Sequence, residues 1–576
     1  MGEGLCLVVS PLISLMKDQV QQLRERRVKA ATITSGLTGI EQEVIYNNCI
    51  HGKIKILYVS PERLKQRVFI EHYRQMKVSL IAVDEAHCIS QWGYDFRPPY
   101  LDIAQIRTYH NNVPILALTA TATPQVIDDI QRQLLFRPRK QVFQASFSRP
   151  NLAYMVFKEG DKEGRMLRIA RHTGGSGIVY VRNRRRTRQV ADFLVHHGIP
   201  ASYYHAGMEP KERDAAQSRW MKGDTAVMVA TNAFGMGIDK PDVRFVIHLD
   251  IPSSIEAYFQ EAGRAGRDGQ KSYAVMLYDD TDIENLHTNF NLSYPPQRQI
   301  ANVYKAICNY YQLPIGSGND CQFDFDIEAL CSTYNFNVVE MFNAARFLER
   351  EGLITLPERE EAESKVYIPI NREEIYRIQV SQPRYSDLLT LLLRMYGGLF
   401  TDYVPISERA IARRLGLDEQ QVTNMLHHRH ALKAVSYKAK SNKPQIIFNS
   451  PRIDTASLYL SESNYRILKE QARQRLEAVL HYVSSTTDCR SRMLLAYFGE
   501  RDVPPCGTCD YCLQAHRTTP QALAPQLLSL LKGHPMRVNE IKEKMPDTDE
   551  ATLQDTLRLL VDARKVFINK ELQFFV

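Results

Sequence analysis

Two acidic residues, Asp84 and Glu85, directly follow an apolar stretch at residues 80–83. A carboxylate that emerges from a buried strand can hold Mg2+, and a second one beside it can polarise the water that attacks a γ-phosphate. On this interpretation Asp84 binds the metal ion and Glu85 activates the water. The alternative is that the two acids only cap the next helix. The pattern predicts a nucleoside triphosphatase site and leaves that structural role open.

A second group of residues could act on the same phosphate. The apolar stretch 226–230 leads into a run with Gly235 and Gly237, whose small size lets the backbone approach a ligand closely. Further along, Arg264 and Arg267 lie three apart, a spacing that would place both on one side of a helical turn. Guanidinium groups delivered from a second domain can neutralise charge that develops on a γ-phosphate. A solvated basic turn is the alternative.

Four of the ten cysteines crowd together late in the chain, at Cys489, Cys506, Cys509 and Cys512. Four thiolates close a tetrahedral shell around Zn2+, and the intervening Pro504, Pro505 and Gly507 supply tight turns. An iron–sulfur cluster also uses four cysteines, and unpaired core thiols are a third possibility. The spacing is a strong metal signal, and on spacing alone zinc and an iron–sulfur cluster both stay open. The remaining cysteines are expected to be structural: Cys6, Cys49, Cys88, Cys308, Cys321 and Cys331.

The first half of the chain alternates short apolar strands with helical stretches, which predicts a parallel α/β architecture. The expected strands cover residues 5–9, 54–59, 80–83, 115–118, 177–181, 226–230 and 244–249. In doubly wound sheets ligands bind beyond the carboxyl ends of the strands. The acidic pair and the glycine run both lie in such positions, so the predicted chemistry and the predicted fold agree.

Hydroxyl and basic side chains in the same turns suit a surface that follows a nucleic-acid backbone. Ser10 and Lys17 follow the strand at 5–9, and Arg63 follows the strand at 54–59. Five arginines crowd into residues 182–188. Because a helix start this basic is poorly placed for the helix dipole, an anionic partner is favoured over a plain solvated cluster.

These runs, in this order, closely resemble the motifs of RecQ-type superfamily 2 helicases over residues 5 to about 285. The stretch 87–98, His-Cys-Ile-Ser-Gln-Trp-Gly-Tyr-Asp-Phe-Arg-Pro, is similar to the aromatic-rich loop of that family. The resemblance implies two RecA-like lobes with parallel sheets, at residues 1–150 and 151–288, with ATP and Mg2+ bound between them. It also implies 3′ to 5′ movement along DNA.

The resemblance carries roles over to individual positions. The catalytic group that it implies is Asp84, Glu85, His87, Gln260, Arg264 and Arg267. The nucleotide-binding group adds Gly237 and Asp239 to Asp84, Glu85 and the two arginines. The DNA-binding group is Ser10, Lys17, Arg63, Trp92, Phe96, Arg97, Arg182, Asn183 and Thr231. Trp92, Phe96 and Arg97 are expected to sense single-stranded DNA and couple it to ATP hydrolysis, since aromatic faces and guanidinium groups stack on bases.

One part of the family pattern has no match. A Gly-x-x-x-x-Gly-Lys-Ser/Thr loop occurs nowhere in the 576 residues, and the glycine cluster at 174–177 is not followed by a lysine and a hydroxyl. The loop is expected upstream of Leu5, so we expect an incomplete start. A paralogue that has lost ATP hydrolysis is less favoured, because both acids and both arginines remain. We expect the chain as printed to hydrolyse no ATP.

The second half is expected to hold three parts. Residues 289–460 replace the short connection typical of the family with two winged-helix-like units, and residues 461–518 form a helical hairpin with the four-cysteine zinc module. Residues 519–576 are expected to form a last winged-helix-like unit. In the insert, helix pairs at 327–334 with 338–351 and at 406–415 with 419–428 each precede a hairpin, the second at 435–448.

The bulk composition agrees with this interpretation. The net charge of +8 is mild support for a nucleic-acid partner, and neither an apolar run of membrane length nor a secretory leader is present. We expect a cytoplasmic protein, associated with the nucleoid in a bacterium or nuclear in a eukaryote, that acts as a monomer on single-stranded and forked double-stranded DNA. An RNA helicase and an ATPase-inactive DNA-binding fragment are the alternatives.

Overall fold

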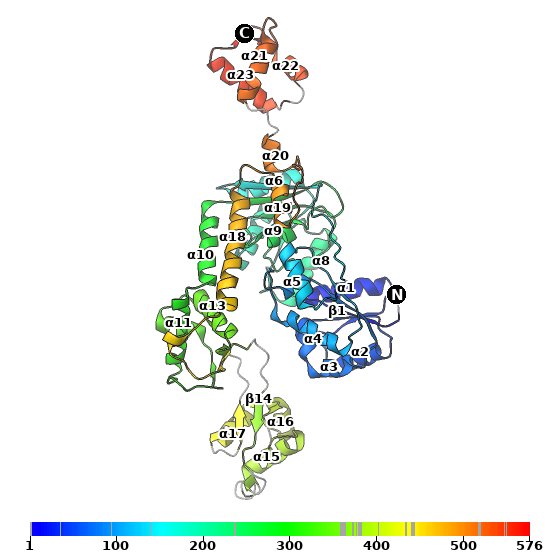
Figure 1. Ribbon diagram of the computed structural model, residues 1–576, viewed down its shortest axis with the longest axis vertical. Helices are drawn as coiled ribbons and strands as arrows, with labels where there is room; N and C mark the ends of the chain where they lie inside the picture. Colours follow the sequence, from blue (N-terminus) through cyan, green and yellow to red (C-terminus); the bar gives the residue numbers. More distant parts are fainter. Residues whose placement is uncertain are drawn as a thin grey trace. The chain divides into compact units, whose positions relative to one another are not determined.

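The computed structural model describes residues 3–576 except for short gaps. These gaps lie at 35, 94, 139, 236–237, 358–363, 371–373, 376, 378–382, 401–402, 432–434, 439–443, 516–519, 546–547 and 549. By its internal contacts the chain divides into two compact units, whose elements are labelled in Figure 1. Unit 1 comprises Met1–His287 and Gln471–Val576, and unit 2 is Thr288–Glu470. Among the described residues no helix is long and apolar enough to cross a lipid bilayer.

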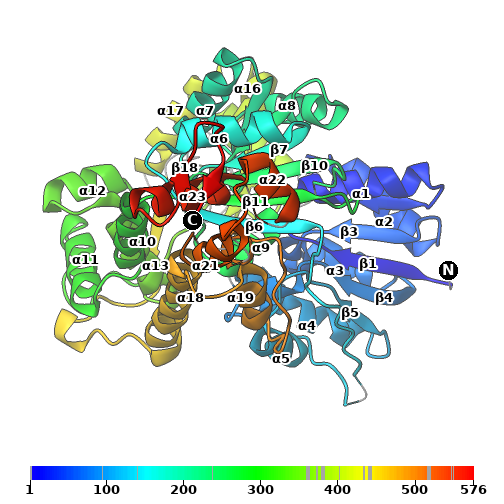
Figure 2. The ribbon, with the colours of Figure 1, turned by 90° about the horizontal axis from the view of Figure 1, so that it is seen from above.

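The first lobe of unit 1 is built on a parallel sheet with the strand order β2-β3-β1-β4-β5, most of which is labelled in Figure 2. Its strands are β1 (Leu5–Val9), β2 (Ala30–Thr32), β3 (Ile56–Val59), β4 (Val78–Val83) and β5 (Ile115–Ala117). Continuous apolar runs form these strands because helices cover both faces of a parallel sheet. Leu7, Val59 and Val83 are fully buried in the resulting core.

Short helices connect these strands. They are α1 (Ile13–Glu25), α2 (Gly39–Ile50), α3 (Arg67–Tyr73), α4 (Ile103–Ile106) and α5 (Pro124–Gln133), with 3-10 turns at Pro61–Lys65, Ala86–Ile89, Pro98–Asp102 and Arg107–Tyr109. Local sequence sets several of the helix starts. Thr38 and Glu41 form a capping box at α2, and Thr123 caps α5 with Pro124 at its first position. The carboxyl ends of β1, β3, β4 and β5 therefore all lead into turns on one edge of the sheet.

The second lobe contains a parallel sheet with the order β6-β11-β10-β7-β9-β8. Its strands are β6 (Leu152–Lys158), β7 (Ser176–Tyr180), β8 (Ala201–Tyr204), β9 (Val227–Ala230), β10 (Val243–His248) and β11 (Ser272–Tyr278). Its helices are α6 (Lys162–Thr173), α7 (Arg184–His196), α8 (Pro210–Lys222), α9 (Ile255–Ala262) and α10 (Asp280–Ser293). The fold class predicted from the sequence is confirmed by these two parallel sheets.

The rest of unit 1 follows α18 (Ile467–Ser484). The four cysteines lie at the N-cap of α19 (Arg490–Tyr497), in the loop that follows it and on α20 (Asp510–Ala515), and α19 and α20 both contact β6. The terminal part contains α21 (Pro520–Leu531), α22 (Val538–Lys544), α23 (Glu550–Asp562), β18 (Phe567–Ile568) and β19 (Phe574–Phe575). A bridge from Met536 to Phe574 adds a third extended segment to the β18-β19 hairpin, which gives the helix–strand–helix–helix–hairpin order of a winged helix.

Unit 2 contains two winged-helix arrangements, one nested in the other. The outer one has α11 (Gln297–Tyr310), α12 (Ile327–Tyr334) and α13 (Val338–Arg350) with a sheet of β12 (Gln322–Asp324), β13 (Ile354–Thr355) and β17 (Gln445–Phe448). The inner one has α15 (Pro383–Met395), α16 (Glu408–Leu415) and α17 (Glu419–Ala431) with a sheet of β14 (Ser364–Tyr367), β15 (Val404–Ile406) and β16 (Ser436–Lys438).

This nesting corrects one prediction. Residues 435–448 were expected to form a single hairpin of the second winged helix. Instead β16 pairs with β14 in the inner sheet, whereas β17 pairs with β12 and β13 in the outer sheet. The physical reason lies in the cores: Tyr437 is buried with the inner helices, and Ile446 and Phe448 are buried with the outer ones.

Candidate active site and metal centre

Asp84 lies at the carboxyl end of β4, next to the end of β1. Because these strands are neighbours, Ser10 Oγ donates a hydrogen bond to Asp84 Oδ2 at 3.1 Å, and the Glu85 N–H donates to Asp84 Oδ1 at 3.0 Å. Burial raises the pKa of Asp84, and the two hydrogen bonds oppose that rise. Ser10 was expected to contact DNA, but it is fully buried and faces the acid. A carboxylate with a hydroxyl beside it fits the oxygen ligands that Mg2+ prefers.

Glu85 occupies an unusual backbone position. Its φ of 46° and ψ of 47° lie in the left-handed region, which is costly for a residue with a side chain. Burial, followed by the charge of Asp84, raises the pKa of Glu85 to about 7. Its Oε2 lies 3.4 Å from His87 Nδ1, and that nitrogen lies 3.0 Å from Thr119 Oγ1 after β5. A carboxyl group that titrates near neutral pH suits a general base.

His87 supports this arrangement as a neutral ring. It is fully buried, and burial lowers its pKa to about 4. The imidazole therefore carries no charge at neutral pH, and its Nδ1 lies within reach of both Glu85 and Thr119. The sequence places His87 two residues after Glu85, and the 3-10 turn that begins at Ala86 brings the two side chains together.

The arginine pair follows α9 in the second lobe. Arg264 is 4% exposed, and its charge opposes the rise that burial causes in the pKa of Glu85. Arg267 is more exposed and donates from Nη1 to Asp239 Oδ1 at 2.7 Å and to the Ile238 carbonyl at 3.0 Å.

The expected placement of both arginines on one helical turn is wrong. Helix α9 ends at Ala262, before either of them, and Gly266 has a φ of 64°. The chain therefore turns between the two arginines and sends them to different surroundings. Gln260 lies on α9 itself and is partly exposed. Gly237, which was expected to contact the nucleotide, lies outside the described residues.

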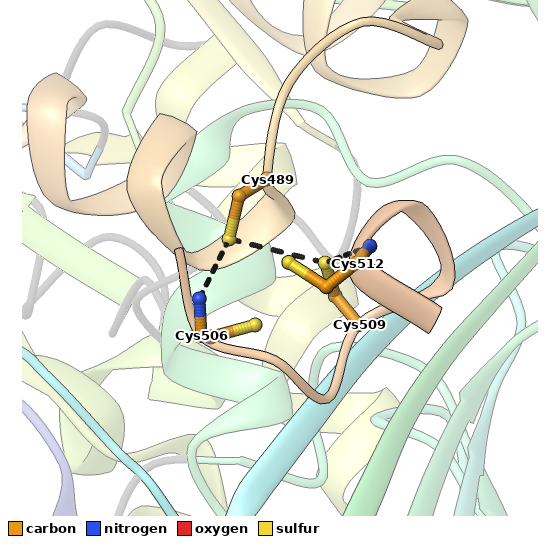
Figure 3. A group of neighbouring side chains, drawn as sticks. All are labelled: Cys489, Cys506, Cys509 and Cys512. Carbon is orange, nitrogen blue, oxygen red and sulfur yellow. Dashed lines mark hydrogen bonds between the residues drawn. The ribbon is translucent and has the colours of Figure 1, made fainter. Parts of the chain in front are cut away.

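The four predicted metal ligands converge (Figure 3). Their sulfur atoms all lie within 4.8 Å of one another, and Cys489 Sγ lies 3.9 Å from Cys509 Sγ. A tetrahedral Zn2+ with Zn–S bonds of about 2.3 Å holds its sulfurs about 3.8 Å apart, so the four thiols fit such an ion. The cysteines come from the start of α19, from the loop that follows it and from α20. Tertiary folding thus brings Cys489 to the other three.

Arg490, beside the first cysteine, fixes the metal-binding loop. Its guanidinium group is 5% exposed and pairs with Asp510 at 2.9 Å, and it also donates to the Tyr482 carbonyl. Tyr482 in turn packs against Tyr258 of α9, with ring centroids 5.3 Å apart. The buried ion pair joins α19 to α20, and the contact between Tyr482 and Tyr258 joins α18 to α9, the helix that precedes the arginine pair.

Comparison with known proteins identifies the parts of the chain. The family models described as DEAD/DEAH box helicase and Helicase conserved C-terminal domain match residues 1–130 and 161–269. Those described as RecQ helicase winged-helix domain, Bacteroidota, and RecQ zinc-binding match residues 366–439 and 453–513. The chain belongs to the RecQ helicase family. The matched winged helix is the inner one of unit 2, and the zinc-binding match contains all four cysteines.

Several curated relatives are called ATP-dependent DNA helicase RecQ. The protein from Pasteurella multocida is 44% identical over 301 residues, which are 52% of this chain and 47% of the relative. The protein from Bacillus subtilis is 44% identical over 286 residues, 49% of this chain and 48% of the relative. The chain thus spans about half the length of these relatives. A solved structure of S. cerevisiae Dbp5 bound to RNA and ADP BeF3 shares 17% identity, covers 50% of this chain and 75% of that one, and has a TM-score of 0.40, too low to add to the sequence matches.

The aromatic-rich loop of this RecQ chain lies against the first lobe. Trp92 is half-buried and packs on the lobe-one core. Arg97 donates to Asp95 Oδ2 from Nε and Nη2, each at 3.1 Å, and from Nη1 to the Pro11 carbonyl at 3.3 Å. Phe96 is partly exposed between them. The loop is thus folded on its own lobe, with one guanidinium group linking it to the turn after β1.

The other residues expected to bind DNA differ in their exposure. Lys17 on α1 and Arg182 are exposed, and Asn183 is exposed while its side chain caps α7 by accepting from Arg185 N at 2.8 Å. Arg63 is 7% exposed and donates to two glutamine side chains, and Thr231 is 7% exposed. The exposed group can meet a strand directly, whereas the buried pair holds the turns in shape.

The acid Asp250, which the sequence analysis missed, organises part of the arginine run. Its Oδ2 accepts from the Arg182 N–H at 2.9 Å, and its Oδ1 pairs with Arg186 at 2.9 Å. Asp250 follows β10, the neighbour of β7, and the paired arginines follow β7. Predicting this pairing would have required knowing that β7 and β10 are neighbours in the sheet. Arg186, which pairs with Asp250, is less exposed than Arg184 and Arg185.

Proposed function

We propose that this chain forms the motor, zinc-binding and winged-helix parts of an ATP-dependent DNA helicase that moves 3′ to 5′ along one strand and displaces the other. The observation that carries the proposal is the acidic pair after β4, in which Ser10 Oγ donates to Asp84 Oδ2 at 3.1 Å and Glu85 Oε2 lies 3.4 Å from His87 Nδ1. A metal-binding carboxylate beside a buried general base suits hydrolysis of a phosphoanhydride bond.

In this proposal each residue has a defined task. Asp84 and Ser10 hold Mg2+, which neutralises charge on the phosphates. Glu85 accepts a proton from the attacking water, and neutral His87 keeps the Glu85 carboxyl group in place. Arg264 and Arg267 stabilise the charge that develops on the γ-phosphate, and Gln260, Gly237 and Asp239 complete the nucleotide contacts on the side of the second lobe.

Strand movement would follow from closing of the lobes on the nucleotide. Lys17 and the aromatic loop belong to the first lobe, whereas Arg182 and Asn183 belong to the second. Closing on ATP would bring these two sets of strand contacts closer, and hydrolysis would release them. Alternating closure and release moves a single strand past the second lobe, while the winged helices bind duplex DNA.

We propose single-stranded and forked double-stranded DNA as the substrates, action as a monomer, and a cytoplasmic site of action on the nucleoid. The net charge of +8 and the names of the relatives support DNA as the partner. Non-specific binding of this kind rests on phosphate contacts, so its affinity should fall steeply with salt.

The decisive experiment uses a protein in which the expected Gly-x-x-x-x-Gly-Lys-Ser/Thr loop is restored upstream of Leu5, and measures DNA-stimulated ATP hydrolysis by this protein and by its Glu85→Gln variant. Loss of the general base should lower turnover by about 10²-fold or more, while nucleotide binding stays close to that of the wild type. Glu25→Gln, a matched change on the exposed part of α1, should leave turnover unaltered. Undiminished turnover in Glu85→Gln would reject this assignment of the site.

The second candidate, an RNA helicase, shares the acidic pair and the arginine pair. The aromatic loop and the four-cysteine cluster favour DNA. Stimulation of the native ATPase by single-stranded DNA and by RNA of the same length separates the two. Equal or greater stimulation by RNA would favour the RNA helicase.

A further inference from the structure

Arg475 of helix α18 reaches the aromatic-rich loop of the first lobe. Its Nη1 donates hydrogen bonds to the Trp92 carbonyl at 3.2 Å and to the Gly93 carbonyl at 3.0 Å. The loop is closely packed at this point, because a Cβ on Gly93 would lie 2.5 Å from the His87 carbonyl oxygen. One charged nitrogen of α18 therefore donates to two consecutive carbonyl groups of the aromatic-rich loop. The two segments lie almost 400 positions apart in the chain.

The remaining anchors of this loop come from its own lobe. Ser90 Oγ donates to Asp129 Oδ2 at 2.6 Å, and the Trp92 N–H donates to Ser90 Oγ at 3.1 Å. These bonds fix the start of the loop on α5. The contact from Arg475 differs in kind, because it ties the middle of the loop to another part of unit 1.

The same junction continues to the helix that precedes the arginine pair. Tyr497 of α19 donates from its hydroxyl to Glu256 Oε1 on α9 at 2.7 Å. Burial and Glu256 raise the pKa of Tyr497, and the charge of Arg475 opposes that rise. Phe498, the next residue, packs against Phe259 of α9 with ring centroids 4.9 Å apart.

Gly499 and Glu500 bring two more parts of the chain into this junction. A Cβ on Gly499 would lie 2.8 Å from Pro124 at the start of α5, and Glu500 accepts from the Phe147 N–H at 2.6 Å. Residue 147 lies between the two lobes, and its ring stacks on Phe498. The segment 497–500 therefore touches the first lobe, the connection between the lobes and α9.

We infer that Arg475 is a positioning residue that holds the aromatic loop against the first lobe and links it, through Tyr497 and Glu256, to the helix that leads into Arg264. The inference rests on the proposed function, in which Trp92 senses the DNA strand. A strand that stacks on Trp92 must move this half-buried side chain away from the core, and the carbonyl of the same residue is held by Arg475. Strand binding therefore breaks the two hydrogen bonds and frees the guanidinium group, which alters the polar junction at α9.

The purely structural alternative is that Arg475 only stabilises the packing of α18. On that alternative the loss of Arg475 lowers stability without changing the exposure of Trp92.

The chain contains two tryptophans, and Trp220 is fully buried. Acrylamide quenching of tryptophan fluorescence therefore reports mainly on Trp92, and a Trp92→Phe variant supplies the contribution of Trp220 to be subtracted. This measurement needs no nucleotide.

In the absence of DNA, Arg475→Ala should raise the quenching constant of Trp92 about twofold, because the loop opens locally when its external anchor is lost. Arg475→Lys should restore most of the protection, since one charged nitrogen makes both bonds. Arg473→Ala, a matched change on the same helix at a side chain that is 52% exposed and paired with Glu477, should behave like the wild type. Unaltered quenching in Arg475→Ala would overturn the inference.

Adding a single-stranded oligonucleotide separates this inference from the proposed function. In the wild type the oligonucleotide should change the quenching of Trp92 and the amide hydrogen exchange of residues 255–262. In Arg475→Ala the change in exchange at α9 should be lost although the oligonucleotide still binds. If Arg475→Ala exposes Trp92 but the oligonucleotide never affects that residue, the sensing role of Trp92 fails and the anchoring role of Arg475 stands. If exchange at α9 responds equally in both proteins, the link through Arg475 is refuted.

Discussion

The carboxyl group of Glu85 provides a test of the active site that needs no ATP. Its pKa is raised from 4.5 to about 7, chiefly by burial, and its side chain is 17% exposed. Because the folded protein holds the proton more tightly than the unfolded chain, the stabilising contribution is complete below pH 4.5 and is lost as the pH rises through 7. Ionisation at high pH thus costs the folded state roughly 3 kcal/mol. Glutamine, which imitates the protonated acid, avoids this cost.

Glu85→Gln should therefore stabilise the first lobe more at high pH than at low pH. Of the total, about 2 kcal/mol develops between about pH 5.5 and 8.5, which corresponds to a difference of roughly 4–8 °C in the melting temperature of a lobe of this size. His87 does not disturb the comparison, because its lowered pKa affects the variant and the wild type alike. Glutamine also accepts the left-handed backbone of position 85 about as well as glutamate, so strain cancels.

The assay monitors the thermal unfolding of both proteins across this pH range by calorimetry, which resolves the transition of the first lobe from the other transitions. Glu25→Gln, on the exposed end of α1, controls for the loss of a surface charge. A gap between Glu85→Gln and the wild type that stays constant with pH would refute the reasoning, as would destabilisation by Glu85→Gln at every pH.

Three further predictions concern the metal, the DNA contact and the chain itself. Purified protein should contain about one Zn2+ per chain and be colourless, and Cys509→Ser should lower the yield of folded protein, because a structural zinc site contributes directly to folding; iron on elemental analysis would contradict this. In a protein with the phosphate-binding loop restored upstream of Leu5, Trp92→Ala should reduce DNA-stimulated ATP hydrolysis far more than basal hydrolysis, and equal losses of both would make Trp92 a structural residue. The chain of 576 residues, which contains no Gly-x-x-x-x-Gly-Lys-Ser/Thr run, should bind single-stranded DNA but hydrolyse ATP no faster than its Glu85→Gln variant; rapid hydrolysis would show that another segment cradles the phosphates.

Strands with long apolar runs could be predicted from the sequence because their signal is local. All seven expected strands occur, with ends within two residues of the prediction. In the described part of the two lobes four other strands were not predicted, and β2, with the sequence Ala-Ala-Thr, shows why. Its three residues carry too little apolar character to stand out, and it forms a strand because β3 offers it a parallel partner. Pairing of that kind depends on tertiary structure.

The residues of the candidate site also divide into those with a local sequence signal and those whose partners depend on tertiary structure. Asp84 and Glu85 could be found from their position after an apolar strand, and the four cysteines from their spacing. The partnership of Ser10 with Asp84 could not, because it depends on β1 and β4 being neighbours although 74 residues separate the two side chains. Arg475 carries no local signal at all. It is one basic residue on α18, and its contact with the Trp92 carbonyl forms only when α18 has packed beside the aromatic-rich loop.

The pairing of β13 with β17 explains how one winged helix can be inserted into the other. The inner winged helix is inserted between β13 and β17, which are paired strands of the outer one, with Ile354 opposite Phe448 and Thr355 opposite Ile447. The two points of attachment are therefore the adjacent ends of one hairpin, about 5 Å apart. An insertion at such a place adds little loop-closure entropy and leaves the pairing of the outer sheet intact. Each unit keeps its own buried core, with Leu330 and Phe448 in the outer one and Leu392 and Val422 in the inner one. A hairpin tip can thus accept a whole winged helix because neither core has to be opened to make room for it.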